Sequence, residues 1–178
     1  DHVPDAMMDD PLYERLQTGF AHNDSNVREM TLKGALTLVP RLSERVITAS
    51  LLRHLSKLQI DEDPAIRANT TICLGNIAKY LSQATAKRVL LNAFTRSLKD
   101  GFPPARLAGL MALEHTTQYY EPLEVSQRLI PALAPLMTDI EKDVRTRAFT
   151  VLELYVQGLK GHSEALELGP EAAAAHVE

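Results

Sequence analysis

The sequence predicts an all-α solenoid, a stack of about four helical hairpins that repeat with a period of 39 residues. Arginines recur at intervals of 39 residues, and apolar residues upstream of them keep the same interval. A fixed period of this length is typical of repeat proteins whose hairpins stack side by side. The composition agrees, because Leu and Ala dominate, aromatic residues make up 5% and Trp is absent. The anchoring arginines are Arg28, Arg67, Arg106 and Arg145.

Each unit is expected to contain two helices. The first carries a leucine column, formed by Leu12, Leu51, Leu90 and Leu129. The second begins near the arginine. In the second unit, apolar or small residues from Ile66 to Leu81 follow the spacing of an amphipathic helix. The units are expected near residues 11–42, 48–81, 86–120 and 124–159, so the solenoid covers residues 11–160.

The segments outside the repeats are expected to be a short N-terminal flank, residues 1–10, and a C-terminal tail or linker, residues 161–178. Because the chain begins at Asp1 without a methionine, we expect it to be part of a larger protein. Pro131 and Pro135 fall within the first helix of the fourth unit, and interior prolines kink or break a helix. That helix is therefore predicted to be bent or split.

An aspartate stands six positions before the arginine in three of the four units, and His22 replaces it in the first. Stacked units place such residues at one height, so each arginine is expected to bridge to the acid of its own or of the adjacent unit. We interpret the pattern as a structural ladder rather than an active site. Its members are Asp61, Arg67, Asp100, Arg106, Asp139 and Arg145.

Catalytic motifs are missing from the sequence. No Walker A loop, H-E-x-x-H, C-x-x-C or G-x-S-x-G occurs, so we expect neither an enzyme nor a cofactor. The six histidines share no repeat column, which argues against a metal site. Cys73 lies in a core column and is interpreted as inert packing. No transmembrane segment or secretory leader is expected, and a single cysteine favours the cytoplasm.

Charge is distributed unevenly along the chain. Residues 28–106 carry a net charge of +7, whereas residues 1–27 carry −5 and residues 107–178 carry −6. The repeat register places basic residues of the second and third units on the outer faces of two neighbouring first helices. This basic patch is our hypothesis for a partner-binding surface, the alternative being ordinary solvated helix faces. Its members are Arg53, Lys57, Arg88, Arg96 and Lys99.

The segment 64–113 contains the string NTT-x-CLG, in which Asn69, Thr70, Thr71, Cys73, Leu74 and Gly75 stand. It resembles the HEAT-repeat region of the Scy-one-like (N-terminal kinase-like) pseudokinase family, and the likeness covers roughly residues 11–160. The resemblance implies a HEAT/armadillo-type fold, an upstream kinase-like domain in the full-length chain, and roles in Golgi and coat vesicle trafficking and in tRNA export. It also implies a cytoplasmic, Golgi-associated location.

Two functions remain in view. The first is a non-catalytic protein-interaction scaffold that docks coat or trafficking components. The second is a tRNA/RNA-binding platform that uses the basic patch to contact phosphates. The concentration of Lys and Arg favours the second. The sequence pI of about 5.9 and the scarcity of aromatic residues for base stacking argue against it.

Overall fold

The computed structural model describes residues 11–168, in which helices and turns occur and no strand is present. These residues form two compact groups, 11–119 and 120–168. Residues 11–119 contain three helical hairpins, and residues 120–168 contain one. The prediction of an all-α chain built from helical hairpins is therefore confirmed.

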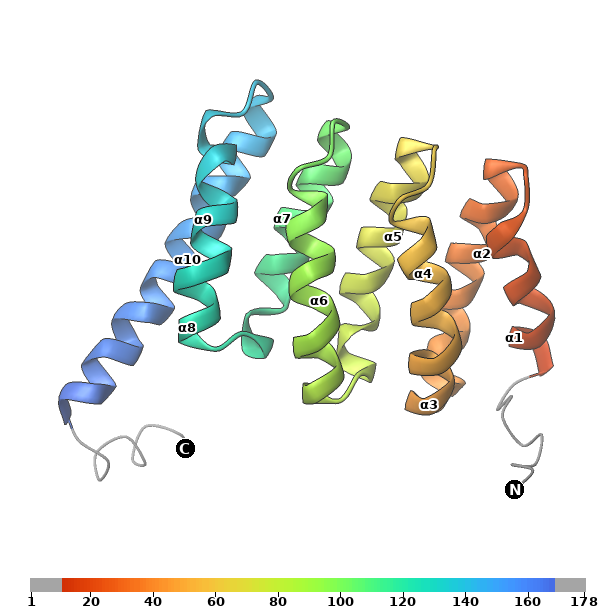
Figure 1. Ribbon diagram of the computed structural model, residues 1–178, viewed down its shortest axis with the longest axis horizontal. Coiled ribbons are helices and arrows are strands. Elements are labelled where there is room, and N and C mark those ends of the chain that lie inside the picture. The colour runs from red at the N-terminus through yellow and green to blue at the C-terminus, as the bar shows by residue number, and fades with distance from the viewer. Residues whose placement is uncertain (1–10, 169–178) are drawn as a thin grey trace. The chain divides into compact units, whose positions relative to one another are not determined.

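The three hairpins of residues 11–119 are formed by α1 and α2, by α3, α4 and α5, and by α6 and α7 (Figure 1). A π-helical turn, Ile47–Leu51, joins α3 to α4, and short 3₁₀ turns follow most of the other helices. The helices are α1 (Pro11–Leu16), α2 (Ser25–Leu38), α3 (Glu44–Val46), α4 (Leu52–Leu58), α5 (Pro64–Ile77), α6 (Gln83–Ser97) and α7 (Pro103–His115).

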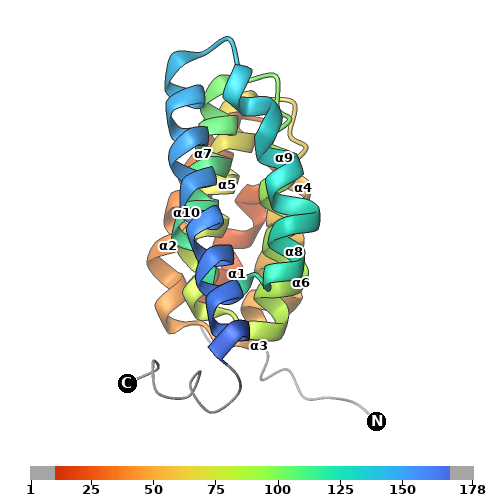
Figure 2. The same ribbon diagram turned by 90° about the vertical axis from the view of Figure 1, so that its left-hand side faces the viewer.

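The helices of residues 11–119 lie in two layers. In the view along the stack, α4 and α6 lie on one side and α5 and α7 on the other (Figure 2). Helix α5 packs against both α2 and α7, so the second helices form a continuous layer. Both ends of the α3–α4 segment are bonded to α6. The Glu44 carboxylate accepts the Ser82 N–H at 2.8 Å, and the Gln59 amide donates to the Ala93 carbonyl at 3.2 Å.

The repeat is visible in where the second helices begin. They start at Ser25, Pro64, Pro103 and Lys142, each 39 residues after the last. Asp24 and Asp63 cap the first two by accepting N–H groups of the opening turn. Proline at the first position of α5 and α7 suits a helix start, because its missing N–H would have no partner there.

The core lies between the two layers. Leu51, Leu55, Leu90 and Phe94 are fully buried from the first layer, and Ile66, Leu74, Leu110 and Leu113 from the second. Gly109 lets α6 and α7 approach closely, since a Cβ there would lie 3.0 Å from the Ser97 Cβ. The hydroxyls of Ser97 and Thr71 form a buried hydrogen bond of 2.7 Å across the layers.

Residues 120–168 form a hairpin whose first arm is interrupted. The arm consists of α8 (Pro122–Glu124), a π-helical turn (Val125–Leu129), α9 (Ile130–Leu133) and a 3₁₀ segment (Ala134–Thr138), and α10 (Lys142–Leu168) is the second arm. The interruption predicted from Pro131 and Pro135 is confirmed. A π turn also occurs at Ile47–Leu51, where no proline stands, and the sequence analysis did not predict it.

The predicted domain limits stay predictions. Helix α10 continues past residue 160, so residues 161–168 of the expected tail are helical. The expected flank, residues 1–10, and the last ten residues of the tail lie outside the described residues.

Candidate functional site

Arg67 and Arg28 each bond to two successive units. The Nε and one terminal nitrogen of Arg67 donate to the two carboxylate oxygens of Asp100 at 2.7 and 2.9 Å. The other terminal nitrogen donates to the backbone carbonyl of Asp61, in the turn of its own unit, at 2.9 Å. Arg28 repeats the arrangement, with a 2.8 Å salt bridge to Asp61. The sequence left open whether each arginine pairs with the acid of its own unit or of the adjacent one. For Arg67 and Arg28, the adjacent unit supplies the carboxylate, and the turn of the arginine's own unit supplies a backbone carbonyl.

Arg106 and Arg145 also bond to the turn of their own units. Arg106 donates to the Asp100 carbonyl at 2.8 Å, and Arg145 donates to the carbonyls of Asp139 and Ile140 at 2.6 and 2.9 Å. The ladder therefore ties each turn to the start of its second helix. A planar guanidinium with five N–H donors suits this combination of carboxylate and carbonyl acceptors.

The first unit keeps the turn although it lacks the aspartate. In later units the carboxylate also closes the turn, as where Asp100 accepts the Phe102 N–H at 2.9 Å. In the first unit His22 Nδ1 accepts the Asp24 N–H at 3.0 Å instead, and the His22 carbonyl receives Arg28 at 2.8 Å. The imidazole therefore replaces the local function of the carboxylate in this turn.

The electrostatics of the ladder support a structural function. The hydrogen bond from Arg67 holds the pKa of Asp100 below its usual value, and the same contact raises the pKa of Arg67. Charged groups so paired are held in their ionised forms. Burial raises the pKa of the Cys73 thiol to about 12, so no thiolate nucleophile forms there near neutral pH.

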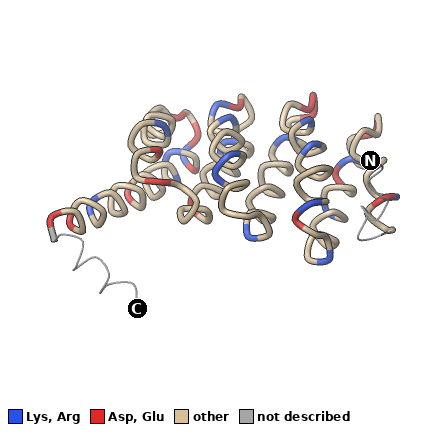
Figure 3. Tube along the Cα trace, turned by 60° about the horizontal axis from the view of Figure 1, so that its bottom comes forward, with Lys and Arg blue, Asp and Glu red and all other residues tan. Residues whose placement is uncertain are grey.

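The basic patch consists of exposed side chains from α4, from α6 and from the turn after α6. Figure 3 marks where Lys and Arg occur along the chain trace. Arg53 and Lys57 lie one turn apart on α4, Arg88 and Arg96 lie about 12 Å apart along α6, and Lys99 lies in the turn after α6. None of the five forms a side-chain hydrogen bond or salt bridge within residues 11–168. Neither α4 nor α6 contains an acidic residue, so no carboxylate on these two helices offsets their positive charge.

His54 adjoins the basic patch and was not singled out by the sequence analysis. Its ring stacks on Phe20 with centroids 4.9 Å apart. Partial burial lowers its pKa, and the positive charges of Lys57 and Arg53 lower it further. The positive charges of the patch thus disfavour protonation of the His54 imidazole. Its place between two cations on one helix was the available sequence signal.

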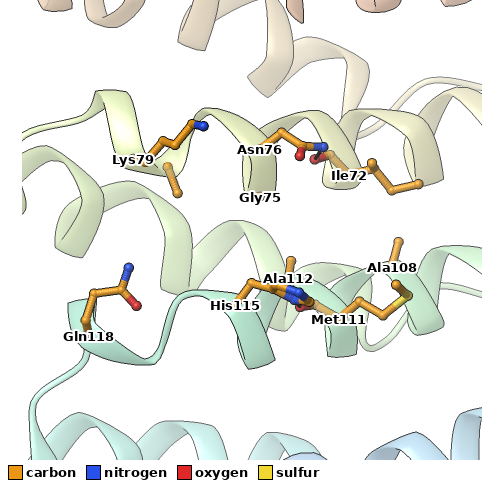
Figure 4. A pocket seen from close by; sticks show the side chains of 10 residues that line it. Ile72, Gly75, Asn76, Lys79, Ala108, Met111, Ala112, His115 and Gln118 are labelled. Carbon is orange, nitrogen blue, oxygen red and sulfur yellow. Dashed lines mark hydrogen bonds between the residues drawn. The ribbon is translucent and has the colours of Figure 1, made fainter.

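A groove between α5 and α7 is a second surface feature that the sequence analysis missed. It has a volume of about 420 Å³ and belongs to the layer of second helices (Figure 4). Exposed Ile72 and Met111 lie at one end, and Lys79 and Gln118 lie at the other. The available sequence signal was the group of small residues Gly75, Ala108 and Ala112, because small side chains let two helices approach closely.

The fold and the ladder define the class of protein as an α-solenoid of HEAT repeats, and a HEAT-repeat family model matches residues 51–81. The crystal structure of Cex1p matches with a TM-score of 0.79 at 31% identity, over 88% of this chain and 30% of that one. "Probable inactive serine/threonine-protein kinase scy1" of Dictyostelium discoideum is 34% identical over 165 residues, which are 93% of this chain and 20% of that protein. "Cytoplasmic export protein 1" of Saccharomyces cerevisiae is 32% identical over 104 residues, or 57% and 14% of the two chains.

These matches confirm the resemblance to the HEAT-repeat region of the Scy-one-like pseudokinase family. The chain spans only about a fifth or less of the length of these two curated relatives. Within residues 11–168, no helix combines the length and the hydropathy needed to cross a bilayer.

Proposed function

We propose that this chain is a non-catalytic protein-interaction scaffold, the HEAT-repeat part of a pseudokinase that acts in Golgi and coat vesicle trafficking and in tRNA export. Two relatives support this proposal by name, one as a probable inactive kinase and one as a cytoplasmic export protein. A cytoplasmic, Golgi-associated location and an upstream kinase-like domain belong to the same proposal.

The observation that carries the proposal is the unpaired basic patch. Four of its five side chains project from two helices whose inward faces are packed in the core, and Lys99 lies in the turn directly after α6. Positive charge on a pre-ordered surface attracts an acidic partner and limits the entropy lost on binding. The patch therefore suits an acidic segment of a coat or trafficking component.

The alternative is a tRNA/RNA-binding platform on the same patch. The five cations would contact phosphates, which supply most of the sequence-independent affinity for nucleic acids. Base stacking receives little support, because Tyr13, Phe20, Phe94 and Tyr119 are buried within the core of residues 11–119. The other Phe and Tyr rings of these residues, Tyr80 and Phe102, are partly exposed but do not belong to the patch. A protein partner is therefore the better-supported proposal.

The test is a charge reversal of Arg53, Lys57, Arg88 and Arg96 to Glu. A matched control reverses four other exposed basic residues and so gives the same change in net charge: Arg15, Arg45, Lys142 and Lys160. Both variants should keep the far-UV circular dichroism of the parent chain, since no core residue changes. The probes are a fluorescein-labelled peptide of alternating Glu and Leu, and labelled bulk tRNA, each titrated by anisotropy at several salt concentrations.

We expect the patch reversal to weaken peptide binding about 30-fold at low salt, from roughly 0.5 kcal/mol for each of four exposed pairs. The control should retain most of the affinity. Equal losses in the two variants would show that net charge, and not this patch, attracts the peptide. Tight tRNA binding with a steep salt dependence that only the patch reversal removes would favour the RNA platform instead.

A further inference from the structure

The groove between α5 and α7 lies in the other helix layer from the basic patch (Figure 2). Gly75 and Ala112 face each other at its centre, where a Cβ on Gly75 would lie 3.4 Å from the Ala112 Cβ (Figure 4). These small residues form a shallow floor, and longer side chains from the two helices stand along its edges. The hollow is of the size that holds small ligands or short peptide segments.

One end of the groove is apolar. Ile72 on α5 and Met111 on α7 flank it and leave 48% and 42% of their surfaces exposed, with Ala108 beside them (Figure 4). Exposed aliphatic side chains that converge on a hollow gain free energy when another apolar group covers them. This end therefore suits an aliphatic side chain of a partner.

The middle and the other end of the groove are polar. The Asn76 amide donates to the Ile72 carbonyl at 3.0 Å, so its side-chain oxygen stays available as an acceptor. The ring of His115 is bonded through Nδ1 to the Met111 carbonyl at 2.7 Å. Lys79 lies over the ring of Tyr80, with 5.1 Å between ammonium and centroid. No acidic residue lines the groove, so a carboxylate is the complementary group for Lys79.

A second hollow of about 250 Å³ adjoins the first on the α2 side of α5, and Leu36 and Tyr80 contribute to its wall. Asn76 and Lys79 line both hollows and so form the ridge between them. Neighbouring packed helices lie roughly 8–10 Å apart, about the rise of three residues in a polyproline II segment, in which side chains three positions apart share one face. A peptide that crosses the ridge would place side chains three residues apart in the two hollows.

We propose that this surface binds an extended, acidic peptide segment of a partner protein, which crosses α5. One aliphatic side chain enters the α5–α7 groove, a second enters the hollow beside Leu36, and a carboxylate between them pairs with Lys79. The Asn76 oxygen accepts a backbone N–H of the peptide. The site goes beyond the proposed function and does not depend on it, because it uses a different helix layer and aliphatic anchors.

The test uses the ¹⁵N-labelled 178-residue chain and three capped peptides. The probe is GSLSDLSG, in which two leucines stand three residues apart around an aspartate. One control peptide replaces both leucines by serine, and the other replaces the aspartate by lysine. The protein variants are Lys79→Glu and, as a matched control at an exposed cation of the other helix layer outside the basic patch, Arg45→Glu. The measurements are backbone amide shifts and dissociation constants.

We expect the probe to give saturable shifts at Ile72, Asn76 and Met111, and the serine peptide to give none. Lys79→Glu should change the preference between the aspartate and lysine peptides by about tenfold in favour of lysine. Arg45→Glu should leave that preference unchanged. The proposal is overturned if groove amides do not shift, or if the two variants change the preference equally. It is also overturned if these amides shift with protein concentration alone, since a second copy of the chain would then be the occupant.

Discussion

Replacing Arg67 by Ala should destabilise the chain by about 2–3 kcal/mol. The change removes two bonds to Asp100 and one to the Asp61 carbonyl at 2.7–2.9 Å. Breaking a fully buried ion pair costs about 3–5 kcal/mol, and an exposed pair contributes about 0–1 kcal/mol. The side chain of Arg67 is 24% exposed and that of Asp100 is 12% exposed. Water can therefore partly resolvate the remaining carboxylate, which places the expected value between these limits.

Urea unfolding followed by circular dichroism at 222 nm measures this effect. With an m-value of about 2 kcal/mol per molar, the midpoint should fall by about 1 M. Arg145→Ala is the control, because Arg145 bonds to the carbonyls of its own turn without a salt bridge in the described part of the chain. It should cost about 1 kcal/mol. A second check combines Arg67→Ala with Asp100→Asn in a double-mutant cycle, for which we expect a coupling of about 1–2 kcal/mol.

A coupling below about 0.3 kcal/mol, with equal effects of Arg67→Ala and Arg145→Ala, would refute this reasoning. The pair between units would then be a solvated contact. The repeats would be held together by apolar packing alone, and the 39-residue Asp and Arg pattern would need another explanation.

Three other predictions concern packing, reactivity and pH. Gly109→Ala should destabilise, because its Cβ would meet Ser97 at 3.0 Å and Leu98 at 3.1 Å, whereas Gly75→Ala should stabilise by up to about 1 kcal/mol in urea unfolding. Cys73 should react with a thiol reagent only as fast as the chain opens, and rapid labelling of the native chain would contradict its burial. The lowered pKa of Asp100 stabilises the folded state above its unfolded pKa of about 3.9, and this contribution is lost as the pH falls through the folded value. As the pH falls, the free energy of unfolding should therefore decrease less for Arg67→Ala than for the parent chain. Unfolding measurements of both proteins at a series of acidic pH values would show this difference.

The repeat was predictable from the sequence because one period governs both packing and polar contacts. Leu51 and Leu90 keep one column and are both fully buried, and Arg67 keeps its place at the start of the second helix. The acid that pairs with each arginine could not be predicted. Residues 6 and 33 positions away are both possible partners when the stacking distance between units is unknown.

Features that depend on small shifts of the backbone could not be predicted either. π-helical turns occur at the same register in two first helices, Ile47–Leu51 and Val125–Leu129, whereas that register in α6 stays α-helical, although all three segments carry a leucine at the shared column. The groove between α5 and α7 could not be predicted for the same reason. Small residues such as Gly75 and Ala112 indicate that two helices approach closely, but only the packed side chains show that a hollow remains between α5 and α7 beside Ile72 and Met111.

The ladder also determines which surfaces of residues 11–119 are available for binding. It places the paired charges in the turns between helices, and the leucine columns place the apolar contacts between the layers. The outward faces of α4 and α6, and those of α5 and α7, therefore contribute little to stability. Substitutions at Lys57 on one face or Lys79 on the other should change binding without unfolding the chain. This separation makes the two proposed surfaces independently testable, because a defect at one leaves the other as an internal control for correct folding.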